Sequence, residues 1–397
     1  MVTEKITLQN PERFSGSFEL DRAKLDRAID IAGEKLKARL NAHGDELPYS
    51  STEGYAYHSF KNPQIDWTAG MYTGCFWLAY ELTGDSVFKD AAVRQREMFK
   101  RRLYEKIGVD DHDVGFLFTP TAVAEYKITG NEEAKKLALE AVEYFYEKSY
   151  SHEGKFIIRS WKSWDAGGGC RTMMDSLMNA PLLFWASSVT DDPKYKNAAI
   201  DHVKTTLKYL IRSDASTYHH YQFDPKTAAP LHGVTWQGNR DESCWSRGHS
   251  WGIYGLPIAY SYTGLDLIPD VYRDITYFML NHLPEDLIPY WDYDFVSGDE
   301  PRDSSAAAVA ICGMHEMNKH LPDTEYAPIF KNAGAMMLNN LIDICTADIG
   351  VPFEGLIHKV THAKPQGRGI DQCAVYGDYF YLDALLRYTK PECKMYW

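Results

Sequence analysis

The sequence predicts an all-α protein in which a single domain, residues 1–397, forms an (α/α)6 barrel of six inner and six outer helices. Two observations predict this fold: a short polar turn recurs along the chain, and the segments before and after each turn differ in polarity. The spacing between successive turns is irregular, unlike that of a solenoid with a fixed period. Long loops explain this irregular spacing, and the count of six inner and six outer helices predicts a closed double ring whose inner helix ends open on a central cleft.

The recurring turn is the easiest part of the repeat to recognise. Its clearest copies lie at residues 82–85, 128–131, 189–192 and 262–265, with weaker ones at 320–323 and 388–391. Glycine at such a turn, as at Gly84 and Gly130, ends a helix at low cost because it tolerates a positive φ. The Asp or Asn beside the glycine can then cap the next helix. Each turn is expected to join an inner helix to an outer one.

The flanking segments fit this alternation. Weakly charged segments expected to be buried on most sides are 67–82, 172–189 and 246–262. Amphipathic segments with one wet face are 23–32, 134–142 and 195–203, and the first of these can pair with the first inner helix. Long loops are expected before inner helices, around residues 104–112, 151–171, 213–245, 284–302 and 346–372. Loops gathered at one end of a rigid scaffold are where binding residues usually lie.

Composition and charge exclude several classes of protein. Hydrophobic residues make up 45% and charged residues 24% of the chain, so it can bury a sizeable core. The net charge of −13 argues against a nucleic-acid or anionic-membrane surface, which needs clustered Lys and Arg. The chain begins without a basic segment followed by an apolar run, and no stretch approaches the roughly 18 apolar residues of a membrane span.

Cysteine usage indicates a reducing compartment. The seven cysteines are scattered and form no Cys-x-x-Cys pair, so we interpret them as reduced thiols and not as a disulfide framework or a zinc site. We expect a cytoplasmic protein, a monomer or weak homo-oligomer, with no nucleic-acid or membrane partner. Aromatic residues make up 14% of the chain, and many lie beside polar residues, which suits a cleft that stacks on flat ligands.

Two acidic residues, Asp113 and Asp175, occupy equivalent places in the repeat, each in the first turn of an expected inner helix. An Asp in a first turn also interacts favourably with the helix dipole, which by itself explains many such residues. Asp175, however, follows a run of glycines at 167–169 and precedes an apolar run at 177–183. A carboxyl group set against apolar packing and near a second carboxylate is pushed toward the protonated form that a general acid requires.

A second dense region spans residues 235–251. Arg247 and Trp251 are four residues apart, hence on one face of a helix, where they can hold a sugar carboxylate and stack on a ring. Packing explains Trp251 alone about as well as a ligand does, but it explains Gln237, Arg247, His249 and Trp251 together less well. The adjacent His219 and His220 lack a matching third ligand, so no metal is expected.

A basic stretch lies further along the chain and contains His358, His362, Lys364 and Arg368. It is either an ordinary solvated loop or the contact for an anionic group on the substrate.

Several separated motifs, in order, resemble those of the unsaturated glucuronyl hydrolases, glycoside hydrolase family 88. They lie at residues 112–116, 171–179, 216–219, 244–251 and 376–381, and the similarity runs from about Trp67 to Leu386. The resemblance implies the (α/α)6 barrel, no cofactor, and a substrate that carries an unsaturated uronic acid at its end, as polysaccharide lyases produce.

The resemblance also implies an unusual hydrolysis, in which the C4–C5 double bond of the uronic acid is hydrated. The position of the general acid/base falls on Asp175 and that of the second carboxylate on Asp113. Protonation of C4 gives an oxocarbenium ion at C5, water deprotonated by the same carboxylate adds there, and the hemiketal opens. The substrate-contact positions fall on Trp67, His112, Trp161, His219, Gln237, Arg247 and Trp251, with Trp164 a neighbouring candidate for the place of Trp161.

One departure from the family pattern affects specificity. Members that prefer sulfated glycosaminoglycan disaccharides carry a Ser-x-x-Ser-x-Lys-like run where this chain has residues 365–370, although Lys364 and Arg368 could replace it. The alternatives are an unsaturated rhamnogalacturonyl hydrolase with the same chemistry on pectin fragments, a sugar 2-epimerase on the same fold, and a helical glycan binder without activity.

Overall fold

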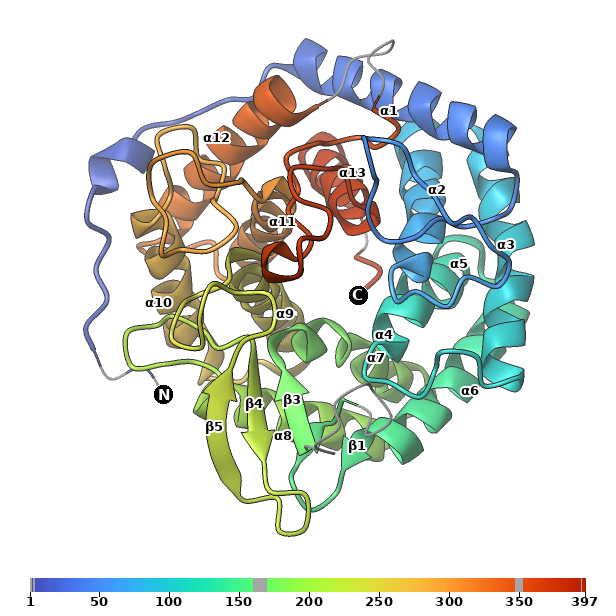
Figure 1. The fold of residues 1–397 in the computed structure, drawn as a ribbon, viewed down its shortest axis with the longest axis horizontal. Helices are drawn as coiled ribbons and strands as arrows, with labels where there is room; N and C mark the ends of the chain where they lie inside the picture. The colour runs from blue at the N-terminus through green and yellow to red at the C-terminus, as the bar shows by residue number, and fades with distance from the viewer. Residues whose placement is uncertain (1, 3, 160–169, 347–352, 394) are drawn as a thin grey trace.

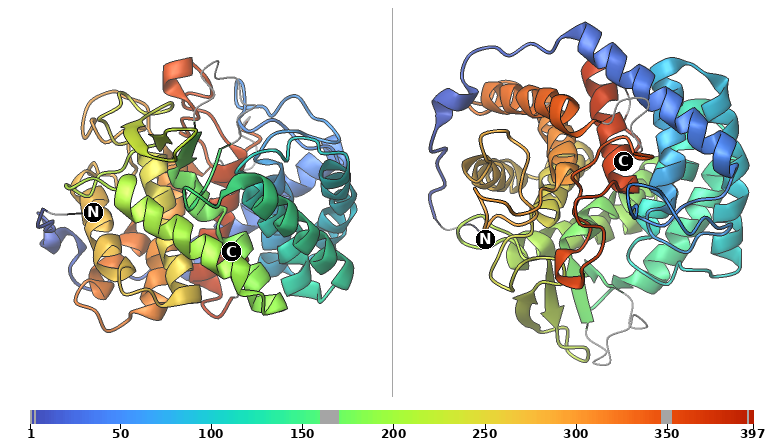
Figure 2. Two further views of the ribbon diagram at one scale, coloured as in Figure 1. Left: turned by 90° about the horizontal axis from the view of Figure 1, so that it is seen from below. Right: turned by 45° about the horizontal axis from the view of Figure 1, so that its top comes forward.

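The helices of this protein follow one another around a ring, as seen in a computed structural model that describes all residues except 1, 3, 160–169, 347–352 and 394 (Figure 1). The outer layer consists of α1 (Arg22–His43), α3 (Ser86–Tyr104), α6 (Glu132–Ser149), α8 (Pro193–Tyr209), α10 (Ile268–Asn281) and α12 (Ala327–Cys345). The inner layer consists of α2 (Ala69–Thr83), α4 (Val114–Phe118), α5 (Ala124–Thr129), α7 (Pro181–Thr190), α9 (Ser246–Thr263), α11 (Ser304–His320) and α13 (Val375–Thr389). Figure 2 shows the long connections gathered at one end of this ring.

The predicted turns end and begin helices as expected. Gly84, Gly130 and Gly264 end α2, α5 and α9 in the left-handed conformation. The side chains of Asp85 and Asn131 cap α3 and α6 by accepting a backbone N–H. The turn after α9 differs, because α10 begins several residues later without a side-chain cap. The weaker turns at 320–323 and 388–391 end α11 and α13 without a left-handed residue.

The chain is mostly helical, as predicted, but short strands that the sequence did not indicate occur in the connections. Strands β1 (Tyr150–Ser151) and β2 (Phe156–Ile157) form one antiparallel pair. Strands β3 (Cys170–Met173), β4 (His220–Phe223) and β5 (Pro230–Val234) form a three-stranded antiparallel sheet. Thr172 faces Tyr221 in this sheet, a partner far along the chain. Periodicity within one segment cannot reveal such pairing, so the strands were missed.

The inner helix expected over 172–189 is also shorter than predicted. Its first part is strand β3 followed by the 3₁₀ helix η3 (Met174–Met178), and α7 begins only at Pro181. Proline fits a first helical turn, since its missing N–H needs no partner there. Asp175 therefore lies in a 3₁₀ turn and not in the first turn of an α-helix. A similar break separates α4 from α5, where the π-helix η2 (Thr119–Val123) contains Pro120.

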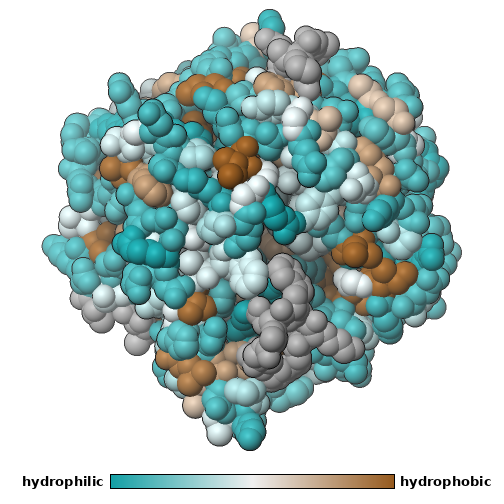
Figure 3. Space-filling model, in the orientation of Figure 1, coloured by the Kyte–Doolittle hydropathy of each residue, from teal (hydrophilic) through white to brown (hydrophobic). Residues whose placement is uncertain are grey.

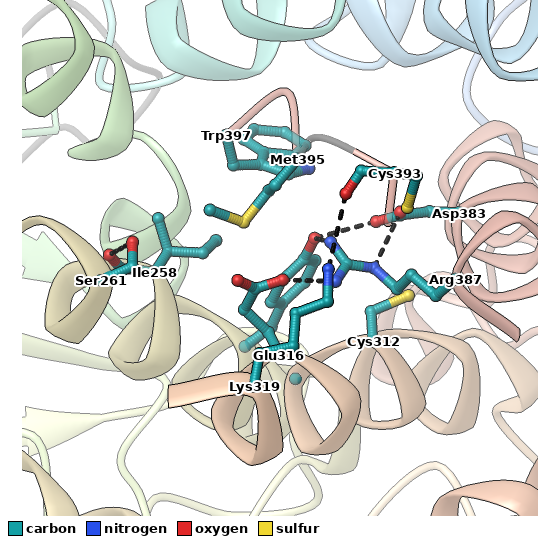
Figure 4. Close-up of polar contacts among 12 residues, drawn as sticks. Ile258, Ser261, Cys312, Glu316, Lys319, Asp383, Arg387, Cys393, Met395 and Trp397 are labelled. Atoms are coloured by element: carbon teal, nitrogen blue, oxygen red, sulfur yellow. Dashed lines mark hydrogen bonds and ion pairs between the residues drawn. The ribbon is translucent and has the colours of Figure 1, made fainter. Parts of the chain in front are cut away.

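The far end of the ring is closed by a buried charged network and by the last residues of the chain. Arg387 donates to Asp383 at 2.9 Å and to Glu316 at 2.5 Å, and all three side chains are buried (Figure 4). Trp397 is 1% exposed and packs against Phe380 and Phe116. No helix in the described part of the chain is both long enough and apolar enough to cross a bilayer.

Candidate active site

A cavity of about 190 Å³ opens at the end of the ring where the connections gather. The surface is hollowed near the middle of this face (Figure 3). Nine of the residues predicted to form the site line the cavity, namely Trp67, His112, Asp113, Asp175, His219, Gln237, Arg247, Trp251 and Arg368. Trp161, its neighbour Trp164 and the glycine run at 167–169 lie outside the described residues.

The two predicted catalytic carboxylates meet at one nitrogen of His112. Nε2 of His112 is 3.4 Å from Oδ1 of Asp113 and 3.2 Å from Oδ1 of Asp175. The other ring nitrogen, Nδ1, contacts Oδ1 of Asp111, which also accepts the backbone N–H of His112 at 2.7 Å. Carboxylates only accept hydrogen bonds, so a ring with carboxylates at both nitrogens is best served by protons on both.

The cluster shifts the proton affinity of its members in different directions. Burial alone would lower the pKa of His112, but Asp113, Asp111 and Asp175 outweigh it and raise this pKa well above its ordinary value. Burial raises the pKa of Asp113 to about 7, with Asp111 and Asp175 adding to the effect and His112 opposing it. The raised pKa of Asp113 lets the pair of carboxyl groups at Nε2 of His112 hold one proton near neutral pH, as a general acid requires.

A buried amide joins the two segments that carry the carboxylates. Asp113 stands at the N-cap of α4 and Asp175 lies in η3. Oδ1 of Asn179 accepts the backbone N–H of Phe116 at 2.8 Å, and its Nδ2 donates to the backbone O of Asp175 at 3.3 Å. The two segments approach so closely at Gly115 that a Cβ there would lie 2.4 Å from Cα of Asn179, so only glycine fits.

Aromatic rings form one wall of the cavity. Trp67 stacks on Tyr376, with ring centroids 5.5 Å apart and an angle of 13° between the rings. Phe116 lies behind this wall and contacts Trp67 at 5.2 Å and Trp251 at 5.6 Å. Aromatic faces of this kind suit the flat, apolar side of a sugar ring.

His219 presents a hydrogen-bond donor at the cavity. Its Nδ1 accepts the backbone N–H groups of Trp236 and Gln237 at 3.1 Å and 3.3 Å. Burial lowers the pKa of His219 well below its ordinary value, so the ring is neutral and its proton lies on Nε2. Nε2 has no hydrogen-bond partner among the described residues. Gln237 lies beside it and donates to the backbone O of His362 at 2.7 Å.

Arg247 reaches the cavity with its guanidinium already engaged, which the sequence did not indicate. Nη1 donates to Asp303 at 2.5 Å and to the backbone O of Thr361, and Nη2 donates to the backbone O of His362. Arg247 therefore fixes the wall formed by residues 361–362. His249, from the same helix, does not line the cavity, and its Nε2 contacts the backbone O of Ile275.

The structure separates the two cations of the basic stretch. Lys364 is paired with Glu300 and stands over the ring of Trp291, away from the cavity lining. Arg368 lines the cavity, with its Cζ 5.5 Å from the ring centroid of Tyr49. Of the two, Arg368 is the one placed to meet an anionic group.

Several lining residues were not predicted. They are Tyr49, Asp66, Arg159, Met173, Trp236, Trp245, His362, Ala363 and Gln366. His362 was noticed only as part of the basic stretch. Asp111 was also overlooked, although the run Asp110-Asp111 directly before His112 and Asp113 was a visible signal.

The described residues contain one group whose ligand atoms are close enough for a metal ion, Asp111, His112 and Asp113, within 4.8 Å of one another. The ion-pair contacts of His112 with Asp111 and Asp113 already account for this spacing. A histidine that is protonated on both nitrogens offers no lone pair to a metal.

Comparison with known proteins agrees with this geometry. A protein-family model described as Glycosyl Hydrolase Family 88 matches residues 45–357 of the chain. The chain belongs to glycoside hydrolase family 88. This confirms the resemblance seen in the sequence motifs and makes the protein a glycosidase.

Relatives and solved structures of family 88 cover the whole chain. An unsaturated chondroitin disaccharide hydrolase of Streptococcus pneumoniae is 38% identical, and the match covers 100% of both chains. The crystal structure of an unsaturated glucuronyl hydrolase from Streptococcus agalactiae has a TM-score of 0.95 and 35% identity, covering 100% of this chain and 99% of that one. The structure of a mutant of the latter enzyme, complexed with dGlcA-GalNAc6S, has a TM-score of 0.87 and 34% identity. The match covers 99% of this chain and 100% of that one.

Proposed function

We propose that this family 88 enzyme releases the Δ4,5-unsaturated uronic acid from the non-reducing end of lyase-generated glycosaminoglycan oligosaccharides. The observation that carries the proposal is the meeting of Asp113 and Asp175 at one nitrogen of His112, inside a cavity walled by aromatic rings. The similarity to the Streptococcus agalactiae enzyme, whose mutant was solved with dGlcA-GalNAc6S, supports this substrate class.

In this proposal Asp175 is the general acid and base. A bound uronate brings a negative charge to the cluster, which favours keeping the proton on the carboxyl pair. Asp175 takes the one proton that the carboxyl pair holds and transfers it to C4 of the vinyl ether, and the positive charge of His112 at 3.2 Å stabilises the carboxylate that remains. The same carboxylate then takes a proton from the water that adds at C5. Opening of the hemiketal releases the remaining sugar, so no bond to the anomeric carbon is attacked directly.

The other lining residues bind the sugar rings. Trp67 and Trp251 stack on the uronate, the Nε2–H of His219 donates to one of its oxygens, and Gln237 and Arg247 hold the wall at His362 in place. Arg368 meets an anionic group on the next sugar, such as a sulfate or carboxylate. Trp161 retains its predicted contact role as part of this proposal.

We also propose an overall architecture and a cellular setting for this enzyme. The alternation of inner and outer helices supports a single-domain (α/α)6 barrel over residues 1–397. The net charge of −13 supports a protein without nucleic-acid or membrane partners. Cytoplasmic location and a monomer or weak homo-oligomer remain predictions.

Loss of the ultraviolet absorbance of the conjugated uronate tests the proposal. We expect the wild type to remove this absorbance from unsaturated chondroitin and hyaluronan disaccharides. Asp175→Asn should keep the fold and bind substrate but lower kcat by roughly 10²- to 10⁴-fold, because it removes the proton donor. Asp26→Asn, an exposed position on α1, is the control and should retain full activity. A normal rate for Asp175→Asn would contradict the assignment.

Replacement of the family's Ser-x-x-Ser-x-Lys-like run by residues 365–370 keeps the pectin alternative open. A rhamnogalacturonan disaccharide is therefore included in the assay. Faster turnover of this substrate than of every glycosaminoglycan disaccharide would favour the rhamnogalacturonyl hydrolase.

A further inference from the structure

Asp111 is a third carboxylate at the catalytic cluster, and it contacts Nδ1 of His112, whereas Asp113 and Asp175 lie at Nε2. Its Oδ1 contacts Nδ1 of His112 and also accepts the backbone N–H of the same residue at 2.7 Å. This double contact holds the imidazole in one orientation. The side chain of His112 is 4% exposed, whereas that of Asp111 is 32% exposed, so Asp111 joins the buried ring to the solvent side.

Asp111 adds to the effect of Asp113 and Asp175 on the charge of His112, and it does so at the nitrogen that neither of them contacts. Without a carboxylate at Nδ1, a histidine facing acceptors at Nε2 alone would be satisfied as the neutral Nε2–H form. With Asp111 present, both nitrogens face acceptors, and the doubly protonated ring is favoured. The arrangement parallels an Asp-His pair in which the carboxylate orients the imidazole and stabilises its cation.

We infer that Asp111 is a positioning residue of the reaction, which keeps His112 oriented and positively charged between the two catalytic carboxylates. The inference deepens the proposed function and rests on it for its catalytic meaning. Asp111 does not line the cavity, so it acts through His112 and not by touching substrate.

Other charged or titratable groups face His112 from several elements, and none takes the place of Asp111. They are Asp113 in the same segment, Asp175 in η3, Arg159 after β2, His202 in α8 and His220 in β4. Burial lowers the pKa of His202 and of His220 to about 3, so both rings are neutral near pH 7. Among these groups only Asp113 and Asp175 are carboxylates, and both lie at Nε2.

The charge of His112 can be measured without any activity. The ¹⁵N chemical shifts of histidine distinguish a ring with two N–H groups from a neutral one, and a His112→Gln variant identifies the signals. We expect His112 of the wild type to carry both protons at pH 8, where an isolated histidine is neutral. A neutral His112 in the wild type at that pH would overturn the inference even if the enzyme hydrolyses its substrate.

The catalytic consequence is tested with Asp111→Asn, which keeps the shape and one accepting oxygen but removes the charge. Removing a nearby negative charge lowers the pKa of each remaining group. We expect the alkaline limb of the kcat/KM profile to move to lower pH by about one unit, and kcat at pH 7 to fall roughly tenfold to a hundredfold, the range seen for carboxylates that orient metal-ligating histidines.

Asp110→Asn is the matched control, because it removes the same charge one position earlier. Asp110 contacts the hydroxyl of Tyr144 and does not line the cavity. Its pH profile should overlay that of the wild type. Equal shifts in both variants would show a general charge effect and overturn the inference, as would an unshifted profile for Asp111→Asn. A wild type without turnover contradicts the proposed function but leaves the ¹⁵N result to decide the role of Asp111.

Discussion

At the scale of single residues, the catalytic cluster is defined by where its proton resides. Asp113 and Asp175 both lie at Nε2 of His112. Their side chains are similarly buried, with 17% and 15% of their surface exposed. Burial, reinforced by Asp111 and Asp175 and opposed by His112, raises the pKa of Asp113 to about 7. The buried cluster thus stores a proton near neutral pH while remaining in contact with the cavity.

This proton predicts a pH-dependent difference in stability between the wild type and Asp113→Asn. A carboxyl with a raised folded-state pKa contributes stability that is fully present below its unfolded pKa of about 3.9 and lost as pH rises through about 7. Asparagine does not titrate, so Asp113→Asn should gain in Tm relative to the wild type between pH 4 and 8. Calorimetric scans across this range measure the difference. A constant difference in Tm would contradict the shifted pKa.

At the scale of elements, the connection between α4 and η3 sets the spacing of the two carboxylates. Asn179 is fully buried and bonds to both segments. Neither hydrogen bond of Asn179 was evident from the sequence, because an Asn in an apolar run does not reveal its partners. The same reason hid the sheet that carries His220, whose strands pair across long separations. Helix caps, by contrast, depend on adjacent residues, and so Asp85 and Asn131 were predictable.

Asn179→Ala should therefore impair activity more than stability alone explains. The change leaves the N–H of Phe116 without its acceptor, which costs about 1–3 kcal/mol. A misplacement of about 1 Å between catalytic groups can lower the rate about a hundredfold. Asn131→Ala, which removes the cap of α6, costs about 1 kcal/mol and touches no cavity residue. We expect a lower kcat only for Asn179→Ala at a temperature where both variants are folded. Equal kcat values would argue against a role for the bridge.

At the scale of the whole molecule, ring closure explains why so much of the site could be predicted. Inner helices that begin at the same rim bring Asp113, Arg247 and Trp251 to one cavity from distant parts of the chain. The alternating pattern in the sequence placed Asp113 and Asp175 at the same rim, whereas Trp67, His112 and His219 came from the resemblance to family 88. It could not show that Arg247 is paired with Asp303, because that contact depends on a connection without periodicity.

The ring is closed by a buried ion pair between its first outer and last inner helices. Nη2 of Arg39 in α1 lies 2.8 Å from Oδ2 of Asp378 in α13, with side chains 3% and 0% exposed. Asp378 also accepts the hydroxyl of Tyr57 at 2.9 Å and the backbone N–H of Leu356 at 2.7 Å. Removing Arg39 would leave a buried carboxylate without its counter-charge.

Arg39→Met is accordingly expected to lower the free energy of unfolding by about 3–5 kcal/mol. The double variant Arg39→Met with Asp378→Asn should regain part of this loss, since asparagine can still accept from Tyr57 and Leu356 but carries no charge. Burial raises the pKa of Asp378 and Arg39 opposes this rise, so in Arg39→Met the carboxyl protonates more readily and the deficit should shrink as pH falls toward 5. Thermal unfolding of the three proteins at two pH values measures both effects. A double variant no more stable than Arg39→Met would show that the uncompensated charge of Asp378 does not cause the loss of stability. Packing alone would then hold α1 against α13.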